Sequence, residues 1–533
     1  MTNLLKKQST LPTASGSPLR VTQAWGQAGP TPAGWAATAL ASAGMAPKAS
    51  RAGHPVSEGG GHPLEDARHN RRLIDQENEI KRAFADIETV MADIGAHITG
   101  EDAASEIQAI ARARLGFTFP EAWLAGSWSR PVNLSRLFAY SVFKGFERLA
   151  ARRFDRAHAE MADGEPAPEL IRRWGFHAID ITPCADGRMA GVVDFILRVP
   201  PTVVTSRRSF AGASFDVEQS LRDWADVELR RHRDGVPNPA EDPTRYLKIG
   251  VYHGSSSDPS CQGCAAHGSD ERKASQDLLD RLNALREAVE TSYGDGATVA
   301  TLLVGVDTDT DAIKVHVPDA SGAISLERFI DNAALYEQTR GLARESAKDF
   351  IRTEVARVMG VAADDPATEG MRWFVGYLLK NNIAQIDYVR AYHAGRYPDL
   401  GHTERFITVG DSFDDVQMRN LSYQAQMATV EEGARDMDVG IKVFTGVNLA
   451  RDLPIPVIVH FQYDGRVPGA RDRAVARGRR LEQAIRGRYT DLVNQNALYT
   501  FVAVRDMATP GDLELVDGAE FEPAPSCSCE HKG

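Results

Sequence analysis

The order of predicted elements in the middle of the chain returns in its last third. The strand Leu247–Val251, a loop, a helix and the buried strand Val299–Val306 form one series, which a polar turn connects to the strand Ala312–Val317. A second series runs from the strand Ile455–His460 through a helix to the strand Ala497–Val504, again followed by a turn and a short strand. Strands that alternate with helices indicate a sheet built from βα units. The repeat therefore predicts two copies of one α/β unit.

Each series is preceded by one further strand, Ala178–Pro183 for the first and Arg405–Val409 for the second. Two such units could join into one extended sheet. We expect the first unit to occupy residues 161–400 and the second, shorter one residues 401–525, with a flexible tail at 526–533.

Residues 66–160 predict a small all-α domain. Apolar residues recur at spacings of three and four through Leu73–Ile94, with Glu77 the single polar interruption. This spacing is typical of one amphipathic helix, here of about six turns. Similar helical patterns follow at Ile107–Leu115 and Leu134–Phe154. The pattern suggests no chemistry here, and we interpret the apolar stripes as core.

Residues 1–65 differ in composition from everything that follows. They are rich in Ser, Thr, Pro, Gly and Ala and poor in large apolar residues, so burial cannot offset the entropy of ordering them. The segment is predicted to be disordered. Its net charge is +3 (5 − 2), from Lys6, Lys7, Arg20, Lys48 and Arg51 against Glu58 and Glu65. It is either a passive solvated tail or a tether that folds onto an acidic partner.

Charge and cysteine content exclude several classes of protein. The whole chain carries 61 − 73 = −12, which gives no support to nucleic-acid binding. No apolar run approaches the ~18 residues of a membrane span, and no apolar segment follows the two lysines near Met1 as a signal peptide would require. Five cysteines in 533 residues are too few for a disulfide scaffold. We expect a cytosolic protein whose important cysteines bind metal or act as nucleophiles.

Two cysteines and a histidine follow predicted strands. Cys184 comes directly after Ala178–Pro183, His253 directly after the next strand, and Cys264 lies in the Gly/Ser-rich loop beyond it. Parallel strands would bring the first two to the same sheet edge, and the loop could fold Cys264 back onto them. Two thiolates and an imidazole suit tetrahedral zinc and leave a fourth position open, as in catalytic sites. The alternative is two inert buried thiols and a hydrogen-bonded histidine.

Asp186 and Arg188 lie two and four positions after Cys184, so a gently turning backbone carries all three on one side. A zinc ion with two thiolate ligands is a weak Lewis acid, and a nearby base would help its bound water to lose a proton. An arginine can hold such a carboxylate ionised through two hydrogen bonds. The alternative is a surface salt bridge in a turn.

Three further patterns remain outside this constellation. Cys261 and Cys264 form a C-x2-C whose nearest counterpart, Cys527-Ser-Cys529, is too distant to favour a zinc ribbon. Cys261 could compete for zinc or be oxidised with Cys264. The acidic run Asp307–Asp311 is predicted to be a turn rather than a cation loop.

These motifs together resemble the carboxysome shell carbonic anhydrase family, over roughly residues 66–520. The resemblance rests on Cys184-Ala-Asp-Gly-Arg188, Lys248-Ile-Gly-Val-Tyr-His253, Gln262–Asp270, Gly401-His-Thr-Glu-Arg-Phe406, Arg451–Val457 and Gly465–Arg471. The family pattern is β-carbonic-anhydrase-like, and the wide spacing between His253 and Cys264 points to its carboxysomal branch.

The resemblance implies an α/β fold with an all-α N-terminal domain and two tandem copies of a β-carbonic-anhydrase-like unit, the second without zinc. It implies one Zn²⁺ held by Cys184, His253 and Cys264. It also implies zinc hydroxide that converts CO₂ to bicarbonate, with Asp186 as proton acceptor and Arg188 holding it. His402 is a candidate proton shuttle or a plain surface histidine.

The family also implies a homodimer or larger assembly inside the carboxysome, in the bacterial cytoplasm, supplying CO₂ to Rubisco. Residues 1–65 would attach it to Rubisco or to the shell. The alternative function is a scaffold with structural zinc that links Rubisco and shell. Asp186 and Arg188 discriminate between the two, because a structural site needs neither.

Overall fold

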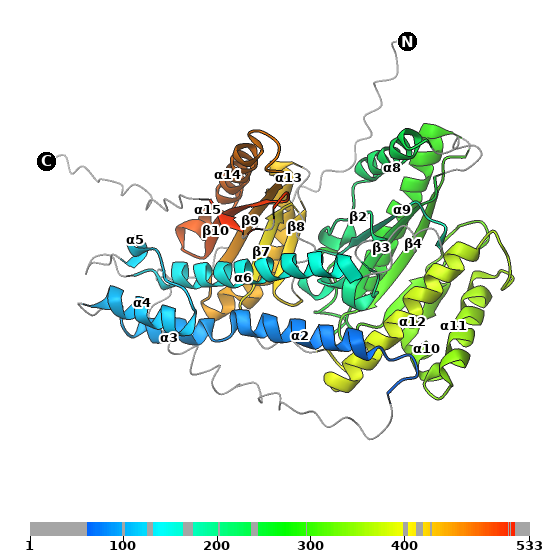
Figure 1. Cartoon of the computed structure of the whole chain (residues 1–533), viewed down its shortest axis with the longest axis horizontal. Coiled ribbons are helices and arrows are strands. Elements are labelled where there is room, and N and C mark those ends of the chain that lie inside the picture. Colours follow the sequence, from blue (N-terminus) through cyan, green and yellow to red (C-terminus); the bar gives the residue numbers. More distant parts are fainter. Residues whose placement is uncertain are drawn as a thin grey trace, which may run out of the picture.

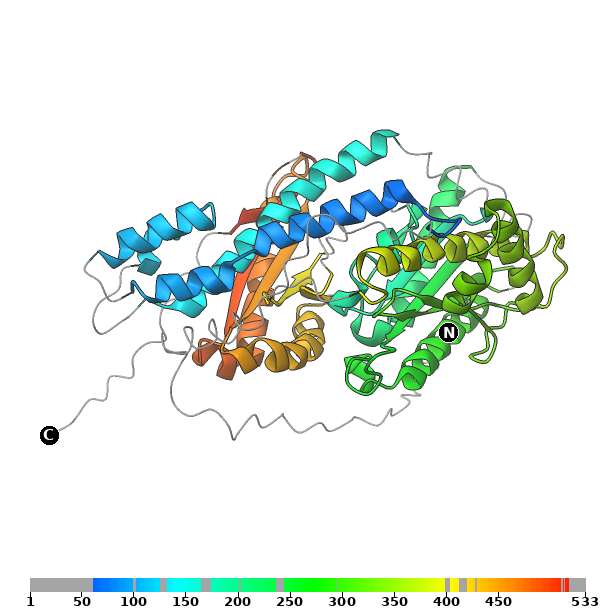
Figure 2. The same cartoon turned by 90° about the horizontal axis from the view of Figure 1, so that it is seen from below.

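A computed structural model describes most of the chain beyond residue 60. The described residues are 61–98, 102–124, 132–163, 174–200, 203–235, 244–294, 296–397, 403–411, 419–426, 429–509, 511 and 513–516. They form a helical layer that runs along two separate α/β sheets (Figures 1 and 2). Among these residues, no helix combines the length and the apolar character needed to cross a bilayer.

The N-terminal part is helical, as predicted, but the expected single helix through Leu73–Ile94 is wrong. Asp86 has a φ of 66°, a left-handed conformation that an α-helix cannot contain, and it divides the segment into two helices. The break lets the second helix lay its apolar side on the long helix that follows. The helices are α2 (Ala67–Phe84), α3 (Ile87–Gly95), α4 (Ala103–Arg114), α5 (Glu121–Leu124) and α6 (Leu134–Asp163).

Glu77, the polar interruption in α2, is a buried anchor. Its carboxylate accepts hydrogen bonds from the hydroxyls of Tyr388 (2.9 Å) and Tyr397 and from His393 Nε2 (3.2 Å). Nearby on α2, Asn70 Oδ1 accepts a hydrogen bond of 3.0 Å from buried Arg198. Buried polar groups need such partners, and here the partners attach α2 to the first α/β unit.

The first sheet has six strands in the order β2-β1-β3-β4-β5-β6. The first four are parallel to one another, whereas β5 and β6 pair antiparallel. Helices α8 and α9 lie on one side and α10 and α12 on the other (Figures 1 and 2). The strands are β1 (Ala178–Pro183), β2 (Ser206–Arg207), β3 (Tyr246–Gly254), β4 (Val299–Asp307), β5 (Ile313–His316) and β6 (Phe329–Asp331). The helices are α8 (Val217–Arg233), α9 (Glu271–Tyr293), α10 (Asn332–Thr339), α11 (Arg344–Met359) and α12 (Glu369–Tyr392).

The second sheet has five strands in the order β11-β10-β9-β7-β8. Helices α13 and α14 cover one face, and α6 packs on β9 and β10 from the other. The strands are β7 (Phe406–Gly410), β8 (Ser422–Gln426), β9 (Ile455–Tyr463), β10 (Leu498–Asp506) and β11 (Glu514–Leu515). The helices are α13 (Val430–Val447), α14 (Ala470–Arg488) and α15 (Thr490–Asn494).

The two sheets share one connectivity. Strands β2-β1-β3-β4-β5 correspond in order and direction to β8-β7-β9-β10-β11, with the last pair antiparallel in both. The loop before the second long helix runs over 255–270 in the first unit and only 464–469 in the second. The units do not join into the extended sheet that the sequence allowed. Edge strand β8 instead meets the segment that follows β1.

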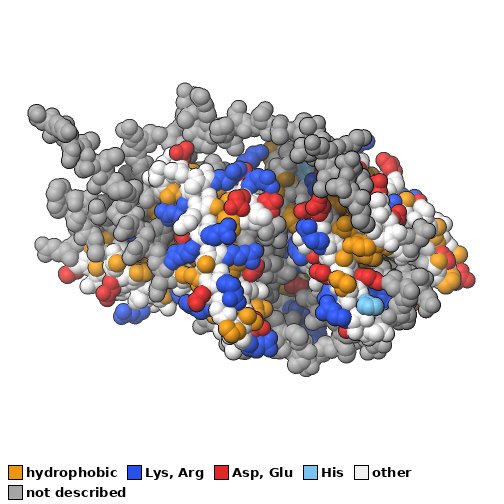
Figure 3. Space-filling view, turned by 90° about the horizontal axis from the view of Figure 1, so that it is seen from above, with side chains coloured by type: hydrophobic (Ala, Val, Ile, Leu, Met, Phe, Trp, Pro, Cys, Tyr) orange, Lys and Arg blue, Asp and Glu red, His pale blue; other side chains and the backbone are white. Residues whose placement is uncertain are grey.

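Helix α14 gives the acidic chain a local basic surface. Figure 3 shows Lys and Arg side chains gathered over this part of the molecule. The arginines of α14 are Arg471, Arg473, Arg477, Arg479, Arg480, Arg486 and Arg488. Several are ion-paired at the surface, for example Arg488 with Asp438 (2.5 Å).

Candidate metal centre

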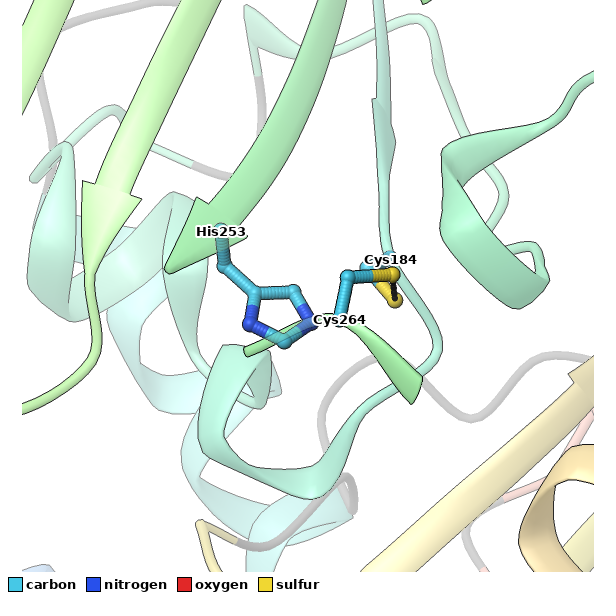
Figure 4. A group of neighbouring side chains, drawn as sticks. All are labelled: Cys184, His253 and Cys264. Atoms are coloured by element: carbon cyan, nitrogen blue, oxygen red, sulfur yellow. Dashed lines mark hydrogen bonds between the residues drawn. The ribbon is translucent and has the colours of Figure 1, made fainter. Parts of the chain in front are cut away.

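The structure brings the three predicted metal ligands together at the carboxyl edge of the first sheet. Cys184 directly follows β1. Strand β3 does not end before His253, as the sequence had indicated, but extends to Gly254, so that His253 is its second-last residue. Cys184 N donates to Val251 O (3.2 Å). This hydrogen bond fixes how the end of β1 is aligned with the end of β3. Cys264 precedes the short helix η5 (Ala265–His267). The three side chains point toward one another (Figure 4).

The geometry fits a metal ion. One ligand atom from each residue lies within 4.8 Å of the others, and the two sulfurs are 3.9 Å apart. His253 is fully buried, yet among the residues that the structure describes neither of its ring nitrogens has a hydrogen-bond partner. A buried polar group without a partner is costly, and a cation at this point would supply one. The donor set of two thiols and one imidazole is typical of zinc.

The two thiols differ in acidity. A hydrogen bond with Cys264, together with burial, raises the pKa of Cys184 well above the ordinary value. The same hydrogen bond lowers the pKa of Cys264 despite burial. The two sulfurs, 3.9 Å apart, are within hydrogen-bonding distance of each other. Binding of a cation at this point would require both of them as thiolates.

Asp186 lies beside this cluster and is held by Arg188. Arg188 Nε donates to Asp186 Oδ1 (3.0 Å) and Nη2 to Oδ2 (2.7 Å), and the backbone N of Arg188 donates to Oδ1 (2.9 Å). Asp186 Oδ2 is 3.8 Å from His253 Nε2. Burial alone would raise the pKa of Asp186, but the charges of Arg188 and His253 and the hydrogen bonds lower it below its usual range. The carboxylate is thus ionised and aimed toward the ligands.

Arg188 also reaches the loop that carries Cys264. Its Nη1 donates to the Gln262 carbonyl, and its Nη2 to Gly263 O at 3.4 Å. Nη1 further donates to the Thr308 hydroxyl (3.3 Å), which in turn donates to Gly254 O (3.0 Å). One guanidinium group therefore links the carboxylate, the ligand loop and the end of β3.

The sequence patterns did not indicate two further residues at the site, Thr308 and His267. Thr308 belongs to the acidic run after β4, which forms a turn as predicted. His267 Nδ1 lies 3.5 Å from Cys264 Sγ, and its Nε2 lies 3.6 Å from Asp277. The spacing Cys264-Ala-Ala-His267 could have indicated this contact, since a single helical turn returns position i+3 to the same side.

The other candidate residues lie elsewhere. Cys261 is exposed, and its sulfur is 3.6 Å from Ser260 Oγ, so the structure does not bring it to the cluster. His402, Cys527 and Cys529 lie outside the described residues.

The equivalent edge of the second sheet has a different set of side chains. By strand register, Asp411 corresponds to Cys184 and Gln462 to His253. Asp411 N donates to His460 O (3.0 Å), as Cys184 N does to Val251 O. Asp411 Oδ2 accepts from Gln462 N (2.9 Å). Within the part of the chain that the structure describes, the Cys184, His253 and Cys264 group is the one cluster suited to a metal.

A Cys₂His cluster with an adjacent carboxylate, at the carboxyl edge of a parallel sheet, is typical of metal-dependent α/β enzymes. Family models narrow this class. Residues 62–154, 167–402 and 403–520 match the N-terminal, catalytic and C-terminal models of Carboxysome Shell Carbonic Anhydrase, respectively. The chain belongs to the carboxysome shell carbonic anhydrase family. It is accordingly an enzyme of the carbonic anhydrase class located in carboxysomes.

Curated relatives agree over most of their length. The chain is 45% identical to the carboxysome shell carbonic anhydrase of Halothiobacillus neapolitanus, covering 86% of this chain and 90% of that protein. It is also 45% identical to the protein of the same name from Prochlorococcus marinus strain MIT 9313, over 88% and 91% of the two chains. The Hydrogenovibrio crunogenus protein is 40% identical, over 86% and 87%.

Proposed function

We propose that this chain interconverts CO₂ and bicarbonate at one zinc ion held by Cys184, His253 and Cys264. The observation that carries the proposal is the convergence of these three buried ligand atoms within 4.8 Å beside the ionised Asp186. When bound, zinc would supply the positive charge that lowers the pKa of a water molecule in the site, so that a nucleophile toward CO₂ is available at neutral pH.

The protein's own residues then handle the proton and the orientation. Asp186 accepts the proton of the water, since its lowered pKa keeps it ionised at neutral pH. Arg188 fixes that carboxylate through two parallel hydrogen bonds. The carboxylate therefore keeps its orientation from one turnover to the next. Burial of the ligands keeps bulk water from screening these charges.

The proposal extends to the organisation of the chain. We interpret the two sheets as tandem copies of a β-carbonic-anhydrase-like unit, at 161–400 and 401–525, behind a helical domain at 66–160. Their common strand order and the family-model boundaries support this division. We further propose a homodimer or larger assembly, tethered to Rubisco or shell by the N-terminal segment.

The deciding experiment combines CO₂ hydration by stopped flow with metal analysis on purified, reduced protein. We expect one zinc per chain and rapid hydration. One zinc per chain with negligible hydration would instead favour the alternative of a structural, zinc-containing scaffold between Rubisco and shell.

The two neighbouring loop cysteines provide a matched pair of variants. Cys264→Ser should lose both zinc and hydration activity, because it removes a buried ligand. Cys261→Ser should retain both, because Cys261 is exposed and outside the cluster. The reverse result would contradict the ligand assignment.

A further inference from the structure

The second sheet reaches the segment that carries the proposed proton acceptor. Its edge strand β8 runs alongside the short helix η1 (Gly187–Met189), which follows Asp186. Two backbone hydrogen bonds cross between the units, from Asn420 N to Gly187 O (3.0 Å) and from Gln424 N to Ala185 O (3.2 Å). Asp186 therefore lies between two residues whose carbonyls are fixed by the other unit.

Gly187 allows this close approach. A Cβ atom at position 187 would overlap the carbonyl oxygen of Ser422 on β8. That oxygen belongs to backbone and cannot move aside as a flexible side chain would. The Gly in Cys184-Ala-Asp-Gly-Arg188 is thus required by the second unit rather than by the local turn.

One side chain of the second unit enters the first unit at the same place. Arg419 is 10% exposed, and its Nη1 lies 3.3 Å from the carbonyl oxygen of Arg188. Its Nη2 donates to the carbonyl of Thr308 (3.1 Å). Arg188 and Thr308 are themselves hydrogen-bonded through their side chains. Arg419 therefore fixes the backbones of two residues that orient Asp186 and the end of β3.

Arg419 is itself held rigidly. Its Nη1 is 2.8 Å from Asp311 Oδ1, and Asp311 is fully buried. Gln385 donates to the other oxygen of Asp311 (2.9 Å). The guanidinium carbon also lies 3.6 Å from the ring centre of Tyr397, a stacked arrangement that favours arginine over lysine. These contacts restrict the orientation of the guanidinium group.

We propose that Arg419 is a positioning residue for the carbonic anhydrase reaction, so that the catalytic site is completed by the second unit, whose described residues hold no ligand cluster. The inference rests on the proposed function, because it acts through Arg188 on Asp186. Without Arg419, the Ala185–Arg188 segment and Thr308 would lose their common anchor. The carboxylate would then spend less time in the productive orientation.

The first test compares Arg419→Met with Arg488→Met, a surface arginine of the same unit paired to Asp438. We expect Arg419→Met to lower kcat about tenfold or more while one zinc per chain is retained and KM changes little. Arg419→Lys should recover part of kcat. Arg488→Met should behave as wild type. Unchanged kcat in folded, zinc-loaded Arg419→Met would overturn the proposal.

A double-mutant cycle separates positioning from general stabilisation. If Arg419 acts through Arg188, then Arg419→Met should cost less than about twofold in an Arg188→Lys background, against about tenfold in wild type. Equal costs in both backgrounds would mean that Arg419 only stabilises the fold. An inactive wild-type protein in the same assay would reject the proposed function instead.

A second position keeps the test informative if Arg419→Met does not fold. Thr308→Val removes the hydroxyl that accepts from Arg188, whereas Thr308→Ser keeps it. We expect kcat to fall at least about threefold in the first variant and to remain near wild type in the second. No difference between them would remove Thr308 from the positioning path and overturn the proposal.

Discussion

Asp186 is the residue on which the proposed chemistry depends most. It follows a ligand by two positions, lies 3.8 Å from another, and is held by Arg188 through both carboxylate oxygens. A carboxylate this constrained is suited to accept a proton without reorganisation. Its environment also means that removing its charge leaves the half-buried Arg188 without its main partner.

We expect Asp186→Asn to lower kcat about a hundredfold or more, because general base catalysis contributes on that scale. Zinc content should stay at one per chain, since the three ligands are intact. Stopped-flow hydration and metal analysis check both. Asp438→Asn, a surface carboxylate of the second unit, serves as the control. Loss of zinc together with activity would indicate that Asp186 helps to hold the metal.

Spacing could predict Cys184, His253, Asp186 and Arg188 because they follow strands that a parallel sheet brings to one edge. Cys264 needed a loop to fold back, which spacing alone left open. Arg419 was beyond prediction. It lies 231 positions from Arg188 in the sequence, and nothing local marks an arginine that crosses between two units.

At the scale of elements, a single left-handed residue, Asp86, divides the predicted helix through Leu73–Ile94 into α2 and α3. The apolar periodicity correctly indicated helix, but α2 ends at Phe84, and Asp86 in its left-handed conformation precedes the first residue of α3. Apolar periodicity cannot reveal a single left-handed residue, because the apolar positions on both sides of that residue keep their spacing. The polar residue Glu77 in the apolar face of α2 is explained by contacts outside the helix. Its carboxylate accepts hydrogen bonds from two tyrosines and a histidine of the first unit.

Replacing Glu77 tests this attachment. Glu77→Leu leaves two buried hydroxyls and an imidazole without an acceptor, and we expect it to lower the free energy of unfolding by about 3 kcal/mol. Denaturant titration measures the change. Glu345→Gln, at an exposed pair with Lys348, should cost less than about 0.5 kcal/mol. Equal effects would mean that the Glu77 cluster is not a stabilising anchor.

Glu404 introduces a pH dependence at the entry to β7. Burial raises its pKa to about 7, and nearby Glu88 adds to the shift. The folded state therefore binds a proton that the unfolded chain has already released above its ordinary value of 4.5. The contribution to stability is complete below pH 4.5 and is lost as pH rises through 7.

We expect the free energy of unfolding to fall by about 1 kcal/mol between pH 6 and pH 8 through this group. In Glu404→Gln that decline should disappear, because the amide does not titrate. Denaturant titrations at the two pH values provide the measurement. An equal decline in both proteins would show that Glu404 is not the group responsible.

The whole molecule consists of two units of one connectivity, bridged by a helical layer. The sequence repeat predicted the common order of strands, because each strand carries its own local pattern. It could not predict whether the units share a sheet, since the pairing of edge strands depends on contacts far apart in sequence. His62 and Leu64, which precede the predicted start of the helical domain at residue 66, are buried.

Removal of residues 1–60 is therefore the appropriate truncation for testing the proposed tether. We expect the truncated protein to retain wild-type kcat and zinc content, because the metal cluster and the contacts described around it lie beyond residue 60. Its binding to Rubisco or shell protein, measured by biolayer interferometry, should weaken. A truncated protein that binds as tightly as the full chain would place the attachment elsewhere.

The contact between β8 and the Ala185–Arg188 segment has a consequence for the substitutions and deletions that such a gene can accept. A unit with no ligand cluster would ordinarily be free to accumulate substitutions or to be deleted. Here Arg419 and the backbone of β8 support residues that the other unit needs for turnover. Selection on activity would therefore reach into the second half of the gene, and a shortened version that keeps only the ligand-bearing half would inherit the metal site without its support.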